Sequence, residues 1–148
     1  MPMARHQLIT CLWWNAHRSR FVVYASERVR DEASQGDSQF AQRRLDIIAV
    51  LLTADVTPAA MDLARLILLE AHLPAKAKVD AEHVAIAAVN GIDYLLTWNC
   101  KHLANPHITP KVARSCRRAG YRPPEICTPE TIIRRVVYGQ SPQQVPNA

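Results

Sequence analysis

The stretch that decides the fold is "VDAEHVAIAAVNGIDYLLTWNCKH", residues 79 to 102, where helical character gives way to strand character. Residues 77 to 89 are rich in small apolar side chains, and Asn90-Gly91 is a typical helix end. Residues 92 to 98 form an apolar run of strand length, which predicts a strand buried on both faces, as in a parallel sheet. A helix, a turn and a buried strand in succession indicate an α/β domain.

The rest of the chain alternates in the same way. Ser26 can cap a helix that runs to about residue 33, and Thr57-Pro58 is a cap followed by a proline suited to the first helical position. We therefore predict an α/β fold with a parallel sheet covered by helices, as one domain over residues 1 to 138 with a disordered tail at 139 to 148. The other predicted helices cover residues 6 to 18, 38 to 50, 109 to 119 and 128 to 138, and the other predicted strands cover 21 to 24, 51 to 56 and 125 to 127.

Composition narrows the class of protein. The 148 residues contain no apolar run near the roughly 18 needed to cross a bilayer, and the N-terminus lacks the features of a signal peptide. We expect a soluble, cytoplasmic protein with no membrane partner and with its four cysteines reduced. A zinc site is an alternative use of some of them, although the spacing matches no usual zinc motif; its members would be Cys100, His102, His107 and Cys116.

The net charge of +5 comes from the last quarter of the chain. Residues 1 to 108 hold 11 basic and 11 acidic side chains, whereas residues 109 to 148 hold seven basic and two acidic ones. Such an excess suits a polyanion such as RNA, and it equally suits a solvated helix face with no partner.

Three oxygen-bearing side chains are predicted to meet at one edge of the sheet. Asp80 lies in the first turn of a crossover helix, Asn99 follows the next strand, and Glu32 lies in the helix after another strand. Ligands of open parallel sheets bind at the carboxyl ends of the strands, and oxygen ligands suit Mg²⁺ or Mn²⁺. Each residue also has a purely structural explanation. Asp80 can interact favourably with the helix dipole, Glu32 can be a solvated residue on a helix surface, and Asn99 can be an ordinary turn residue. His83 and His102 are further candidates with ordinary core or surface alternatives.

Three segments resemble one subgroup of the PIN-domain family, which is similar to VapC-type toxins. Residues 80 to 105, "DAEHVAIAAVNGIDYLLTWNCKHLAN", resemble that subgroup's "DALHIA…G.DYLLTWN.KHLAN" signature. "ASERVRDEASQGD" at 25 to 37 and "GYRPPEICTPETI" at 120 to 132 are similar to two further segments. The resemblance covers residues 7 to 135 and implies a three-layer α/β/α sandwich and a Mg²⁺- or Mn²⁺-dependent endoribonuclease, with an antitoxin as protein partner.

The resemblance also assigns the site residues. Glu32 matches the family's second acidic position, Asp80 the third, and Asn99 the fourth, where many members have aspartate. Family members begin with a central strand that carries the first acid, whereas the first acid here is Glu27. We therefore expect a sheet without its first strand, because the start of the chain is mis-assigned or the chain is truncated. The unpaired edges of such a sheet invite homodimerisation.

Two functions follow as hypotheses. In the first, Glu32, Asp80 and Asn99 hold Mg²⁺ and a metal-activated water cleaves an RNA phosphodiester. In the second, a catalytically impaired fold acts as an RNA- or protein-binding module. Sensitivity of RNA binding to salt, combined with indifference to EDTA, would favour the second.

Overall fold

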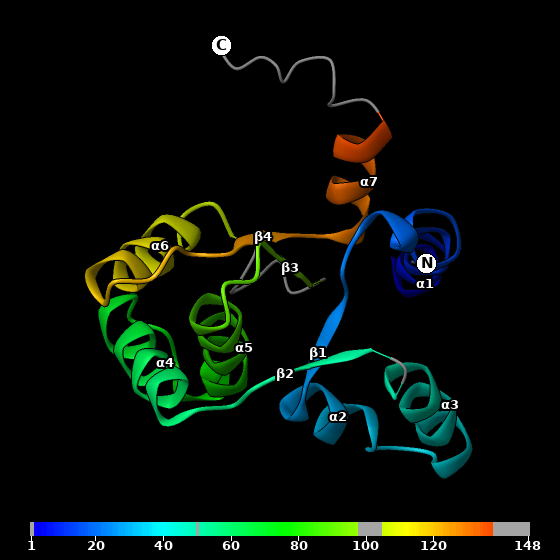
Figure 1. Cartoon of the computed structure of the whole chain (residues 1–148), viewed down its shortest axis with the longest axis horizontal. Helices are drawn as coiled ribbons and strands as arrows, with labels where there is room; N and C mark the ends of the chain where they lie inside the picture. Colours follow the sequence, from blue (N-terminus) through cyan, green and yellow to red (C-terminus); the bar gives the residue numbers. More distant parts are fainter. Residues whose placement is uncertain (1, 50, 98–104, 138–148) are drawn as a thin grey trace.

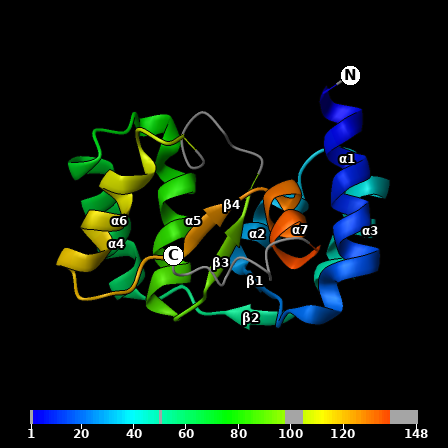
Figure 2. The ribbon, with the colours of Figure 1, turned by 90° about the horizontal axis from the view of Figure 1, so that it is seen from above.

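The computed structural model describes residues 2 to 49, 51 to 97 and 105 to 137. It is a mixed α/β structure in which short strands run between groups of helices (Figure 1). One group contains α4, α5 and α6, whereas α1 contacts α7 and α2 contacts α3. Figure 2 shows the same elements from above. The predicted tail at 139 to 148 lies outside the described residues.

The first half of the chain builds the β1–β2 pair and the helices beside it. The helix predicted at 6 to 18 begins earlier, at Pro2, and ends in a wider π-helical turn. The strand predicted at 21 to 24 is wrong in position, because strand pairing begins only at Tyr24. Phe21 and Val23 pack instead against the cluster around Trp13. The elements are α1 (Pro2–Leu12), η1 (Trp13–His17), η2 (Arg18–Arg20), β1 (Tyr24–Ser26), α2 (Glu27–Ala33), α3 (Ser38–Ile48) and β2 (Leu52–Ala54).

The second half follows the sequence predictions closely. Thr57 caps α4, its Oγ1 accepting a hydrogen bond from the Ala60 amide at 3.1 Å, and Gly91 takes a positive φ of 69° just after α5. These local signals explain why α4 begins and α5 ends where expected. The elements are α4 (Pro58–Glu70), η3 (Ala75–Ala77), α5 (Lys78–Val89), β3 (Tyr94–Leu96), α6 (Thr109–Arg118), β4 (Glu125–Cys127) and α7 (Pro129–Val137).

The strands form two separate parallel pairs. Tyr24 of β1 lies opposite Leu52 of β2, and Tyr94 of β3 lies opposite Glu125 of β4. The prediction that the strand after α5 is buried on both faces is wrong for its described part, since Tyr94 is 39% exposed. The physical reason is that β3 has a strand partner only on its β4 side within the described residues.

The main core lies between α4, α5 and α6. Ile67 of α4 and Val84 of α5 are fully buried, and Cys116 of α6 packs in the same cluster. Alanines line the facing sides of α4 and α5, which lets the two helices approach closely. The chain thus fixes α5, and with it Asp80, against a rigid base.

Polar contacts tie the ends of these elements together. Ser115, fully buried in α6, donates through its Oγ to Glu70 Oε1 at 2.8 Å, and Arg118 pairs with Glu70 Oε2 at 2.6 Å. At the end of α5, Asn90 Nδ2 donates to the carbonyl of Asp55 at 2.9 Å. These bonds join α6 to α4, and α5 to the segment after β2, across large sequence separations.

Candidate functional site

Asp80 is the one predicted metal ligand whose side chain is described. It lies in the first turn of α5 and is half-buried, and His83 lies one turn further along, also half-buried. Glu32 lies in α2, but its side chain is outside the described part of the structure, and Asn99 is outside it altogether, as is His102. The predicted convergence of Glu32, Asp80 and Asn99 therefore stays a prediction.

The end of β1 and the second turn of α5 open onto one groove. Ser26, the last residue of β1, and His83 both line it. Ser26 Oγ accepts a hydrogen bond from the Val29 amide at 3.3 Å, which is the predicted cap at the start of α2. Asp80 is not among the residues that line this groove, so the common edge predicted for the start of α2 and the start of α5 stays a prediction.

The described residues alone do not make a divalent cation site. Among them, no three histidine, cysteine, aspartate or glutamate side chains lie together as a metal-binding group. Glu82, two residues after Asp80, is only 3% exposed and lies in the protein interior, a burial that the charge of its side chain did not indicate. Of the alternative zinc ligands, Cys100 and His102 lie outside the described residues, and Cys116 is enclosed in the core of α4, α5 and α6.

The buried cysteines have inert thiols. Burial raises the pKa of the Cys116 thiol from 9.0 to about 11, against a smaller opposing effect of Arg117. Burial likewise raises the pKa of Cys127 from 9.0 to about 11. Because the thiolate is the reactive form, neither cysteine is a candidate nucleophile, whereas Cys11 is exposed.

These pKa values predict a loss of stability in alkali. Well below pH 9.0 both thiols are protonated in the folded and unfolded chain, so their contribution to the free energy of unfolding is constant. Between 9.0 and about 11 the unfolded chain loses these protons first, so the free energy of unfolding should fall as the pH rises. Urea titrations across this range measure the slope. The Cys127→Ala variant should show a shallower decrease of the free energy of unfolding with pH, and Cys11→Ala should not. Equal slopes in the wild type and both variants would contradict a raised pKa of Cys127.

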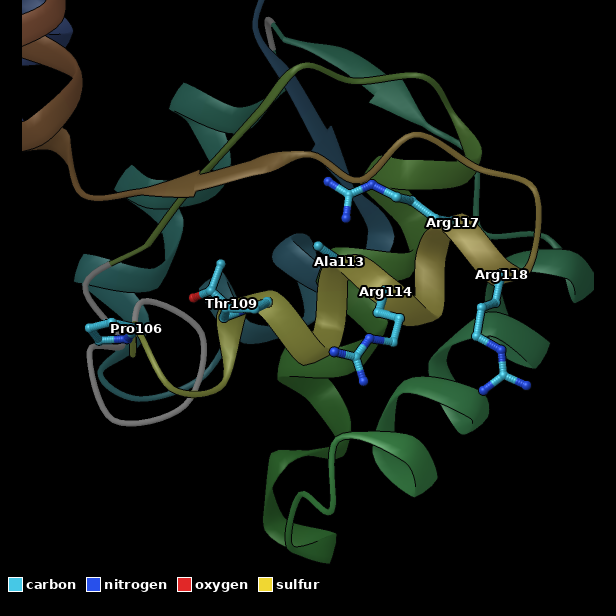
Figure 3. Close-up of a pocket in the computed structure, with 7 residues that line it drawn as sticks. Pro106, Thr109, Ala113, Arg114, Arg117 and Arg118 are labelled. Carbon is cyan, nitrogen blue, oxygen red and sulfur yellow. The ribbon is translucent and has the colours of Figure 1, made fainter.

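A basic surface runs along α6. We define the arginine face as Arg114, Arg117 and Arg118, which line a shallow hollow of about 810 Å³ together with Pro106, Thr109, Pro110 and Ala113. Figure 3 shows the three arginines projecting from α6, with Thr109 at the start of the helix. All three side chains are exposed, so they can reach a ligand without any change in the core.

Ion pairs divide the basic residues of the last quarter into two sets. Arg118 pairs with Glu70, Arg122 with Asp93, Arg134 with Glu130, and Arg135 with Glu125. By contrast, Lys111, Arg114 and Arg117 have no acidic partner within the described ranges. The charge excess that the sequence places after residue 108 is thus concentrated on α6.

Comparison with known proteins identifies no relative of the chain. No protein-family model matches it, and neither curated proteins nor solved structures provide a significant match. Within residues 2 to 49, 51 to 97 and 105 to 137, no helix has the length and apolar character needed to cross a membrane.

Proposed function

We propose that the chain is a Mg²⁺- or Mn²⁺-dependent endoribonuclease with a PIN-like three-layer α/β/α sandwich. The observation that carries the proposal is the placement of Asp80 in the first turn of α5, half-buried at the start of a helix that leads directly into the parallel strand β3. Carboxyl ends of parallel strands are where such folds bind ligands, and α5 begins at that edge.

The chemistry proposed for the site requires more ligands than Asp80. A single carboxylate falls short of the oxygen set that holds Mg²⁺. The proposal therefore assigns Glu32 and Asn99 as the further ligands, on the resemblance of residues 25 to 37 and 80 to 105 to the PIN subgroup. An antitoxin-like protein that covers this rim belongs to the same proposal.

The arginine face supplies the substrate-binding part of the proposal. Arg114 and Arg117 offer planar guanidinium groups that match phosphate oxygens, and both are exposed. Backbone phosphates bind such cations without regard to base sequence. RNA held along α6 would thus be recognised mainly through its backbone.

Asp80→Asn tests the enzymatic proposal. The variant keeps the size of the side chain and removes its charge, so cleavage of a structured RNA with Mg²⁺ should fall more than about 100-fold, since even changes behind metal ligands cost roughly 10- to 100-fold. Asp62→Asn, at an exposed aspartate on α4, is the matched control and should cleave like the wild type. Equal cleavage by both variants, or cleavage that survives EDTA, would overturn the proposal.

A second candidate function is an RNA-binding module without catalysis. Three cations of α6 that have no acidic partner among the described residues, Lys111, Arg114 and Arg117, favour it independently of any metal ligand. In that case the folded wild type binds RNA in EDTA, with an affinity that falls steeply with salt, and cleaves none with Mg²⁺. Cleavage that requires Mg²⁺ would exclude it.

A further inference from the structure

A large groove separates the two strand pairs. We define the β1–β3 groove as the space of about 740 Å³ lined on one side by residues 21 to 26 and on the other by Tyr94, Leu95 and Leu96. Ile86 and Ala87 of α5 and Ile132 of α7 also line it. An apolar groove of this size on the surface is a candidate binding site for another molecule.

Two main-chain edges face this groove. β1 is bonded to β2 and β3 to β4, so each has one edge without a strand partner within the described residues. All three residues of β1 and of β3 line the groove, whereas β4 contributes none of its residues and β2 only Ala54. The unpaired edges of β1 and β3 are therefore the ones turned toward it. Unpaired edges are templates for an added strand.

The groove exposes apolar surface that an occupant would bury. Val22 is 70% exposed, Tyr24 44% and Tyr94 39%, and all three line the groove. Trp13 lines it too, at 7% exposure, and its indole Nε1 is buried without a hydrogen-bond partner among the described residues. A buried donor left unpaired is unfavourable, so an occupant with acceptor groups is favoured over a purely hydrocarbon one.

Polarity and charge define the orientation of the occupant. The ring of Phe21, ahead of β1, meets the ring of Tyr94 edge-on with centroids 6.2 Å apart, so β1 and β3 begin at the same end of the groove. Arg20, next to Phe21 in the chain, lines the groove, and Asp93, next to Tyr94, is paired with Arg122. A strand parallel to β1 and β3 would place an acidic residue at its own start beside Arg20.

We propose that the β1–β3 groove binds an extended apolar peptide strand of another polypeptide, parallel to β1 and β3 and with an acidic residue at its start. Main-chain hydrogen bonds to both edges would join the two strand pairs into one sheet. Valine and isoleucine side chains suit a strand that is covered on both faces. This inference stands on the groove alone and is independent of the proposed nuclease activity.

A designed peptide tests the proposal. The probe is acetyl-Asp-Val-Ile-Val-Ile-Val-Lys-amide, and the control has proline for the central valine, which removes one donor and disrupts strand pairing. Calorimetry should show saturable binding of the probe. The control should bind at least about 10-fold more weakly, because it loses roughly one to two main-chain hydrogen bonds. Hydrogen exchange at the amides of residues 24 to 26 and 94 to 96 should slow when the probe binds.

Protein variants locate the binding. Val22→Asp puts a charge into the groove and should weaken binding of the probe at least about 10-fold, because the bound peptide would remove water from the new carboxylate. Leu69→Asp makes the same change at a similarly exposed leucine on α4, 73% accessible, and should leave binding unchanged. Binding equal in both variants would overturn the proposal.

Other occupants give different results. Uptake of an apolar dye without binding of the peptide would make the groove a small-molecule site. Dimers whose amides at 24 to 26 and 94 to 96 are already protected without peptide would assign it to a second copy of this chain. Either result would overturn the peptide strand as the occupant.

Discussion

Ile67→Ala is expected to lower the free energy of unfolding by about 2–5 kcal/mol, the usual cost of truncating a fully enclosed isoleucine. Ile67 is 0% exposed and lies in the cluster that α4 forms with α5 and α6. Helices fill the space around the side chain, so its removal leaves a cavity that neighbours cannot fully close. Because domains are stable by only about 5–15 kcal/mol, this decrease would be a large share of the total.

Leu69→Ala on the same helix is the matched control. Leu69 is 73% exposed, so its truncation should change the free energy of unfolding by no more than about 0.5 kcal/mol. Urea unfolding followed by circular dichroism measures both variants, and a similar dependence on urea would show that the denatured states are alike. Equal destabilisation by the two substitutions would contradict the packing of α4 against α5 and α6.

The helices of this chain could be predicted because their signals are local. Thr57-Pro58 starts α4, Ser26 caps α2, and Asn90-Gly91 ends α5, and the hydrogen bonds that define these helix ends join residues no more than four positions apart. The strands could be predicted only in part. Which three residues pair depends on a partner elsewhere in the chain, as Tyr24 with Leu52, so the strand expected at 21 to 24 begins three residues too early. The expected burial of residues 92 to 98 assumes neighbours on both sides.

The site could be predicted less completely than the helices. Placing Asp80 at the start of a helix follows from local pattern and is confirmed, whereas its proximity to Glu32 and Asn99 stays a prediction. The sequence predicts unpaired strand edges, whereas the position and size of the groove between β1 and β3 depend on how the two strand pairs are placed. The sequence also shows where the excess of basic residues lies, but not which of them form ion pairs. Arg118 pairs with Glu70 and Arg122 with Asp93, and the partners are far apart in the sequence.

Because Arg114 and Arg117 have no acidic partner within the described ranges, the arginine face is the place to test RNA binding. Reversing two charges, Arg114→Glu with Arg117→Glu, should weaken binding of a labelled single-stranded RNA by about 100-fold at about 0.1 M salt. Two charge-assisted hydrogen bonds are worth roughly 1.5–3 kcal/mol each, and the new carboxylates repel phosphate. The slope of log affinity against log salt should become shallower by about 0.7 for each phosphate that the variant no longer neutralises. Fluorescence anisotropy over a series of salt concentrations measures both quantities.

A control with the same change in net charge separates a local site from general attraction. Arg43→Glu with Arg65→Glu alters exposed side chains on α3 and α4, and it lowers the net charge of +5 by the same four units. If RNA lies along α6, this control should lose far less affinity and should keep most of the salt slope, since screening confines electrostatic effects to about 10 Å. An equal decrease in affinity in both double variants would mean that RNA responds to overall charge, and the arginine face would then not be a binding site.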